Sequence, residues 1–140
     1  MIREARITDH EDIQSICELD LGYVCDEELL ETRLTKLDHD RECVFVAEEG
    51  GKVIGFIHVE IYEVLYAPSM ANVLGIAVSS EFRRQGIGNK LLSEAEEWAK
   101  SKGITMMRLN SGAARKGAHE FYRSLGYNDE KTQLRFLKPL

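Results

Sequence analysis

Residues 83–88 read RRQGIG, and two arginines beside two glycines are suited to binding an anion. The segment follows an apolar run, VLGIAV at 73–78, and precedes a helical pattern, NKLLSEAEEWAKSKG at 89–103. Glycines at a junction between a strand and a helix let the backbone approach a ligand closely, and the first amides of a helix attract negative charge. The residue types and their position therefore predict an anion site at the start of a helix.

The residues around this loop exclude two familiar phosphate-binding patterns. A P-loop places Lys-Ser/Thr after its second glycine, whereas here Lys90 is followed by Leu91 and no hydroxyl is available for magnesium. A dinucleotide-binding loop needs a third glycine and an acidic residue about twenty positions later. Leu91 stands at the third glycine position, and the later region offers only Arg108 and Asn110. What remains is a metal-free site in which helix N-terminal amides hold a pyrophosphate.

The elements that position this loop form a mixed α/β pattern. Gly50-Gly51 predicts a tight hairpin turn, and Gly103 and Gly126 each end a helix. Residue periodicity predicts strands at 2–7, 43–49, 52–65, 71–78, 104–110 and 132–138, and helices from Thr8 or Asp9 onward and at 26–38, 86–102 and 115–125. This order predicts an α/β (α+β) fold with an antiparallel first part and one parallel step through a crossover helix.

Composition favours a soluble cytoplasmic domain that handles charged small molecules. The 140 residues are enough for one domain, 1–140, and the net charge of −6 argues against a nucleic-acid partner. Residues 1–50 carry a balance of −10 and residues 51–140 a balance of +4. Because the sequence is charged from its third residue and has no long apolar stretch, we expect neither a signal peptide nor a membrane anchor. The three cysteines have no metal-ligand spacing, which predicts reduced thiols: Cys17, Cys25 and Cys43.

Two segments together resemble a known family. Arg83, Gly86 and Gly88 form R-x-x-G-x-G after an apolar strand, which is similar to the acetyl-CoA motif of the GNAT superfamily of N-acetyltransferases. AHEFYRSLGY at 118–127 resembles the second signature of that family, a helix with Phe-Tyr that ends at Gly-Tyr. The expected order of elements agrees over essentially the whole chain. The resemblance implies a GNAT domain with acetyl-CoA as co-substrate and with 71–78 and 104–110 as splayed central parallel strands.

The resemblance also implies where acetyl-CoA binds. Backbone groups of Ile76 and Val78 would pair with the pantetheine arm, and the amides of residues 84–89 would hold the pyrophosphate. Side chains of Arg83 and Arg84, with Lys90 or Arg123, would add positive charge. The implied cofactor-binding residues are Ile76, Ala77, Val78, Arg83, Arg84, Gln85, Gly86, Ile87, Gly88, Asn89, Ser111 and Tyr122.

Tyr122 is the catalytic residue that the resemblance implies, as the acid that protonates the departing thiolate. A phenol stays protonated at neutral pH, and can donate a hydrogen bond as charge develops. An alkylamine acceptor must lose a proton before it attacks, and family members often carry a glutamate for this in the strand before the loop. This chain has Leu74-Gly75 there, so Glu60 is the candidate base, with His58 and Glu63 behind it.

The end of the chain is similar to members that acetylate small aminoalkyl compounds. SGAARKGAHEFYRSLGY and QLRFLKPL resemble aminoalkylphosphonate and aminoglycoside 6'-acetyltransferases. Arg115 stands where many members have a cofactor-contacting asparagine, and is a candidate for a phosphate of CoA or an anionic part of the acceptor. In the first two helices, acidic residues predict an acidic rim that suits a cationic amine: Asp20, Asp26, Glu27, Glu28 and Glu31.

The predicted function is acetyl transfer from acetyl-CoA directly to a primary amine of a small molecule. Two alternatives stay open at this point. One is a protein acetyltransferase that acts on a lysine or an N-terminus, and the other is a sensor that binds acyl-CoA without turnover. Neither nucleic acid nor a membrane is an expected partner. The apolar segment TQLRFLK at 132–138 is an edge strand that can pair with a second copy, so a homodimer is also predicted.

Overall fold

A computed structural model describes all 140 residues, which form five strands and four α-helices. Short 3-10 turns lie at Ile7–Asp9 and Ser80–Phe82, and a π-helical turn lies at Cys17–Leu21. The strands and helices are β1 (Ile2–Glu4), α1 (His10–Ile16), α2 (Glu27–Thr35), β2 (Glu42–Glu49), β3 (Lys52–Val64), β4 (Ala67–Val78), α3 (Ile87–Ser101), β5 (Met107–Leu109) and α4 (Lys116–Ser124). No helix has both the length and the apolar character needed to span a lipid bilayer.

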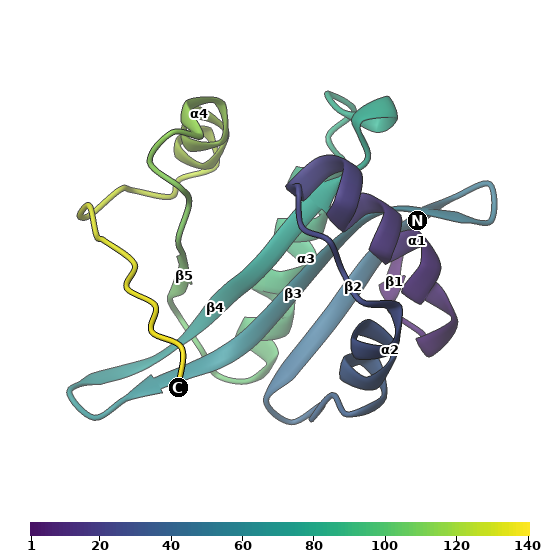
Figure 1. The fold of residues 1–140 in the computed structure, drawn as a ribbon. Coiled ribbons are helices and arrows are strands. Elements are labelled where there is room, and N and C mark those ends of the chain that lie inside the picture. The colour runs from purple at the N-terminus through teal and green to yellow at the C-terminus, as the bar shows by residue number, and fades with distance from the viewer. The chain divides into compact units, whose positions relative to one another are not determined.

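Backbone contacts divide the chain into two compact units, Met1–Leu109 and Asn110–Leu140. The first unit contains the whole sheet, with strand order β1-β2-β3-β4-β5 (Figure 1). Neighbouring strands are antiparallel from β1 to β4, and β4 and β5 are parallel. The parallel step needs a crossover because both strands run in the same direction, and α3 provides it. The predicted mixed sheet is confirmed.

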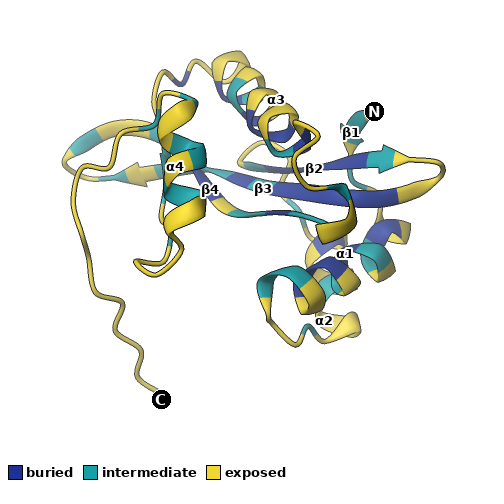
Figure 2. Cartoon of the chain, turned by 90° about the horizontal axis from the view of Figure 1, so that it is seen from above, coloured by how far each residue is buried: buried dark blue, intermediate teal, exposed yellow.

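Helices cover both faces of this sheet (Figure 2). On one face, Phe56 of β3 belongs to a buried cluster with Ile13 and Ile16 of α1. On the other face, a Cβ on Gly55 would lie 3.3 Å from the Leu91 side chain of α3. Because side chains alternate along a strand, even-numbered residues of β3 around this point face α1 and α2, and odd-numbered residues face α3. The fully buried Ile57 accordingly lies under α3.

Some of the predicted strands are shorter than expected or absent. β1 ends at Glu4 rather than at residue 7, and β5 is limited to Met107–Leu109 within the predicted 104–110. The strand predicted at 132–138 is wrong, because no helix or strand follows α4. The large apolar side chains there are exposed, including Phe136 at 86%. Residue preference alone does not make a strand, since the backbone N–H and C=O groups also need a partner strand.

The second unit is built around α4. The turn before the helix is closed by the Arg115 N–H, which donates to the Gly112 carbonyl at 3.0 Å. The chain turns away from the end of α4 at Gly126, whose φ of +93° lies in the region that favours glycine. The Tyr127 N–H then donates to the carbonyl of Tyr122 at 3.0 Å, which stabilises the last turn.

Candidate active site

The loop that precedes α3 presents bare backbone amides. Gly86 is the N-cap of α3 with φ +76°, and no side chain caps this end of the helix. The first helical bond runs from the Lys90 N–H to the Gly86 carbonyl at 3.1 Å, so the amides of residues 87–89 have no intrahelical partner. Arg84 also has a positive φ, +64°, which costs a non-glycine residue about 1–2 kcal/mol. A strained turn that leads into free helix amides is suited to binding a phosphate.

Asp20 anchors the turn before this loop. Its side chain is only 4% exposed and accepts hydrogen bonds from the Ser80 N–H at 3.0 Å and from the Arg83 guanidinium at 3.3 Å. The Asp20 carboxylate therefore balances part of the positive charge of Arg83, whereas Arg84 is exposed and forms no ion pair. From the sequence, Asp20 is expected on an acidic rim. Its contact with a turn sixty residues later was missed, because residue spacing does not reveal contacts between distant parts of the chain.

The second feature of the site is an open edge of β4. β5 pairs with β4 only from Ala71 to Val73, and the rest of β4 up to Val78 has no strand on that side. The Ser79 N–H donates to Ile54 of β3 at 2.7 Å. Since backbone groups along an antiparallel strand alternate in direction, those of Ile76 and Val78 point away from β3 to the open edge. The groups of Ala77 lie between them and pair with β3.

A bulge at Leu74 determines this direction. The register of β3 with β4 shifts by one residue between His58 and Val59, so that Leu74 is the extra residue of β4. Before the bulge, the Ala71 N–H points to β5, where it donates to the Met106 carbonyl at 2.9 Å. Without the bulge, the alternating backbone groups counted from Ala71 would point toward β3 at Ile76 and Val78. The bulge reverses their direction, so that the amides and carbonyls of these two residues are available to a ligand.

Next to the bulge, a polar array lies on the sheet face that α1 and α2 also cover. Asn72 of β4 is 8% exposed, and its amide Nδ2 donates to Glu60 of β3 at 2.9 Å. Its Oδ1 accepts a hydrogen bond from Arg108 of β5 at 2.8 Å. The Arg108 guanidinium also lies over the ring of Tyr62, 4.4 Å from the centroid. The sequence predicted Glu60, but Asn72 and Arg108 were missed because their contact depends on cross-strand register.

The other two base candidates are engaged elsewhere. His58 forms an ion pair with Glu42 of β2, with 2.7 Å between Nε2 and Oε1. Glu63 accepts a hydrogen bond from Arg41 at 2.9 Å, and both of these side chains are about half exposed. Of the three predicted candidates, only Glu60 has its carboxylate oriented by a buried amide.

In the second unit, Tyr122 is half-buried on α4 among aromatic rings. Its ring centroid lies 5.3 Å from that of Phe121 and 6.1 Å from that of Tyr127. Burial raises the pKa of the Tyr122 phenol, and the positive charge of Arg115 opposes this effect without cancelling it. Ser111, another predicted site residue, has a buried Oγ with no hydrogen-bond partner. An unpaired buried hydroxyl is the kind of group that a ligand satisfies.

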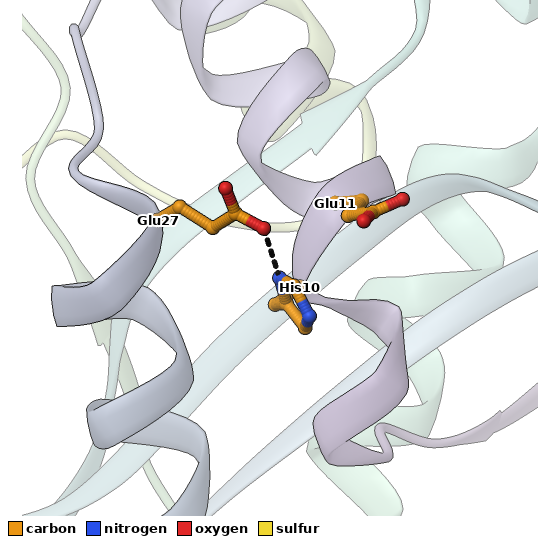
Figure 3. Close-up of side chains that lie close together, drawn as sticks. All are labelled: His10, Glu11 and Glu27. Atoms are coloured by element: carbon orange, nitrogen blue, oxygen red, sulfur yellow. Dashed lines mark ion pairs between the residues drawn. The ribbon is translucent and has the colours of Figure 1, made fainter.

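The acidic residues of the first two helices are partly used within the fold. Asp26 is the N-cap of α2 and accepts from the Glu28 N–H at 3.0 Å. Glu27 forms an ion pair with His10 of α1 at 3.4 Å, and Glu11 lies beside them (Figure 3). This His-Glu-Glu group, which joins α1 to α2, was not predicted. Both carboxylates are exposed, and the ion pair between His10 and Glu27 links the two helices.

Three relatives with curated descriptions illustrate the similarity of this chain to known proteins. An uncharacterized N-acetyltransferase of Methanocaldococcus jannaschii is 33% identical over 97 residues, which is 68% of this chain and 43% of the relative. The aminoalkylphosphonate N-acetyltransferase of Salmonella typhimurium is 31% identical over 68% of this chain and 61% of its own length. An aminoglycoside N(6')-acetyltransferase of Klebsiella aerogenes is 26% identical over 100% of this chain and 97% of its own length. The chain therefore covers less than two thirds of the length of each of the first two relatives.

Solved structures support the fold. The aminoglycoside acetyltransferase AAC(6')-Iy, determined in complex with the bisubstrate analogue CoA-S-monomethyl-acetylneamine, superposes with a TM-score of 0.84. The two chains are 20% identical, and the match covers 100% of this chain and 98% of the other. At this identity the similarity concerns the fold alone, and it confirms the fold class expected from the sequence.

A sequence model of a protein family matches most of this chain. The model of the acetyltransferase (GNAT) family matches residues 5–127, which include the loop before α3, the open edge of β4 and Tyr122. At the level of the family, this match confirms the expected enzyme class, an acyltransferase. The bisubstrate analogue bound in the AAC(6')-Iy structure contains CoA, in agreement with the expected co-substrate, acetyl-CoA. The chain belongs to the GNAT family of acetyltransferases.

Proposed function

We propose that this chain is an acetyl-CoA-dependent N-acetyltransferase that transfers acetyl directly to a primary amine of a small molecule. The observation that carries the proposal is the loop before α3, where Arg84 and Gly86 have positive φ and the first helix amides have no partner. Residues 1–140 would act as one N-acetyltransferase domain, since the family match spans both compact units.

The proposed binding mode uses main-chain groups almost entirely. The pyrophosphate of acetyl-CoA would rest on the amides of residues 84–89, and the exposed guanidinium of Arg84 would add positive charge. The pantetheine arm would pair with Ile76 and Val78 along the open edge of β4. The unpaired hydroxyl of Ser111 supports a role for this residue in binding as well.

The proposed chemistry needs one base and one acid. Glu60 takes the proton of the bound ammonium, directly or through water, and so frees the nitrogen lone pair. The nitrogen attacks the thioester carbonyl carbon, the new C–N bond forms, and the C–S bond breaks. The acylated nitrogen releases its remaining extra proton to water, which leaves a neutral amide. Tyr122 gives its phenolic proton to the departing thiolate and is then reprotonated from solvent. Tyr122 is protonated at neutral pH, since burial moves its pKa further above the ordinary value of about 10, and the neutral phenol can donate a hydrogen bond as charge develops on the sulfur.

A panel of amines tests this proposal through the release of free thiol from acetyl-CoA. We expect turnover with small primary amines, and a fall in kcat of about 100-fold in Tyr122→Phe with little change in the KM for acetyl-CoA. Tyr66→Phe is the matched control, since Tyr66 is 89% exposed in the turn between β3 and β4. A Tyr122→Phe variant that works at the full rate would remove the assigned acid.

The same panel separates the two alternative functions. A protein acetyltransferase would use peptides with a lysine or a free N-terminus and leave small amines unchanged. A sensor would bind CoA and release no thiol with any acceptor. The similarity to the Salmonella typhimurium and Klebsiella aerogenes enzymes favours a small amine over both alternatives. A homodimer and a cytoplasmic location stay predictions from the sequence.

A further inference from the structure

Arg108 is a half-buried cation that no carboxylate neutralises. It forms no ion pair, and its one hydrogen bond runs to the neutral amide of Asn72 at 2.8 Å. A guanidinium has five N–H donors, and within the protein only the bond to Asn72 uses them. The guanidinium also packs on the ring of Tyr62, with its carbon 4.4 Å from the ring centroid. Arg108 is therefore held by Asn72 and Tyr62 and has no carboxylate partner.

An opposite charge lies close by and is kept from pairing with Arg108. The amide of Asn72 stands between Arg108 and Glu60, and donates to the Glu60 carboxylate at 2.9 Å. Its orientation follows from chemistry, because Nδ2 can only donate and Oδ1 can only accept. Asn72 is buried, so this arrangement is held in place. The sheet face thus presents an anion and a cation separated by the width of one amide.

From this separation we infer that the acceptor carries an anionic oxyacid group, a carboxylate, phosphate or phosphonate, a short chain away from its amine, and that Arg108 binds this group. The inference rests on the proposed function, in which Glu60 receives the ammonium. A planar guanidinium binds an oxyacid through two parallel hydrogen bonds, which a lysine cannot do. An amine that carries such a group would satisfy both charges at once, with its nitrogen held at the base.

The position of the array along the sheet fits this role. Asn72 and Arg108 are paired in register in the last stretch where β4 and β5 are joined, directly before the open edge of β4 begins. In the proposed binding mode the thioester lies along that edge. An amine at Glu60 is then at the inner end of the open edge, and the anionic group lies on the β5 side.

Matched acceptors test the inference: butylamine, 4-aminobutyrate and 3-aminopropylphosphonate share a similar chain and differ in the anionic group. We expect the wild-type protein to have a lower KM for the two acidic amines than for butylamine. Arg108→Gln should raise the KM for both acidic amines at least tenfold more than it raises the KM for butylamine, and should leave the KM for acetyl-CoA nearly unchanged. Arg108→Lys should recover part of the loss. Arg33→Gln, an exposed arginine of α2, is the control.

The outcomes separate this inference from the proposed function. If Arg108→Gln changes the KM for butylamine as much as for the acidic amines, Arg108 has only a structural role. If the wild-type protein prefers butylamine, the anion-binding role is also wrong, while the acetyltransferase stands. No thiol release with any amine would overturn both. If Arg108→Gln does not fold, the test is inhibition of the wild-type protein by butyrate and propylphosphonate. Inhibition that is competitive with the amine would support the inference, and the absence of inhibition would overturn it.

Discussion

The phenol of Tyr122 is half-buried between Phe121 and Tyr127, and burial raises its pKa above the ordinary value of about 10. The neutral phenol is favoured by folding, so the free energy of unfolding falls as the pH rises through 10 toward the folded-state pKa. We expect the difference in phenolate absorbance between the wild-type protein and Tyr122→Phe to titrate with a midpoint above pH 10. A midpoint at or below 10 would contradict the assigned environment.

Glu60 gives a second prediction, through the pH dependence of transfer. With Glu60→Gln, we expect kcat/KM for a simple alkylamine at pH 7 to fall about 100-fold, because the ammonium keeps its proton. The loss should shrink as the pH approaches the amine's own pKa, where a base is no longer needed. Glu63→Gln on the same strand is the control, since Glu63 pairs with Arg41. A loss that is the same at pH 7 and pH 10 would assign Glu60 a structural role instead.

At the level of elements, the two ends of α3 provide a matched pair of glycines. Gly86 before the helix and Gly103 after it both have φ +76° and open space around them. Alanine at either position should cost a similar amount of stability, of about 1 kcal/mol, because of backbone strain alone. Only Gly86→Ala should raise the KM for acetyl-CoA, by about tenfold, since only that end is proposed to hold the pyrophosphate. Equal KM values in the two variants would place the cofactor elsewhere.

The junction of β1 and α1 gives a prediction about stability. Burial tends to raise the pKa of Asp9, but hydrogen bonds from the Arg3 guanidinium at 2.8 and 2.9 Å and from the Arg6 N–H at 2.7 Å outweigh it, and the net pKa is lowered. The ion pair therefore adds stability above the unfolded-state pKa of about 4, and this is lost as the pH falls through the lower folded-state value.

We expect Asp9→Asn to lower the free energy of unfolding by about 3 kcal/mol at pH 7, because Arg3 then keeps a buried charge without its main partner. Once the pH falls below the lowered folded-state pKa of Asp9, the wild-type carboxyl loses its charge as well, so the two proteins should become nearly equally stable. Urea unfolding at both pH values measures this. A difference that persists unchanged at low pH would show that shape rather than charge matters at this position.

For the whole molecule, the charge distribution predicts how salt affects cofactor binding. The net charge is −6, yet residues 51–140 carry +4, and the phosphate loop belongs to that part. At about 0.15 M salt the screening length is about 8 Å, so acidic groups farther than this from the loop contribute little there, whereas Asp20 contacts Arg83 directly. We expect the KM for acetyl-CoA to rise with added KCl, whereas that for acetyl-pantetheine, which has no phosphates, should not. Parallel salt responses of the two donors would contradict a phosphate site.

The sequence allowed prediction of those features that depend on nearby residues. The loop before α3 and the Gly50-Gly51 turn could be located because positive φ selects glycine locally. The anchoring of Ser80 by Asp20 and the contact of Asn72 with Glu60 could not, since both join residues far apart in the chain. The incorrect prediction of a strand at 132–138 has the same cause. Its residue types favour a strand, but a strand forms only where another strand lies alongside and pairs with it.

The extra residue in β4 has a consequence for how this protein can vary. Replacing a side chain between residues 74 and 78 leaves the direction of the main chain as it is, whereas losing one residue there would turn the carbonyls and amides of Ile76 and Val78 inward. Natural variants of this stretch should therefore differ freely in composition and hardly at all in length.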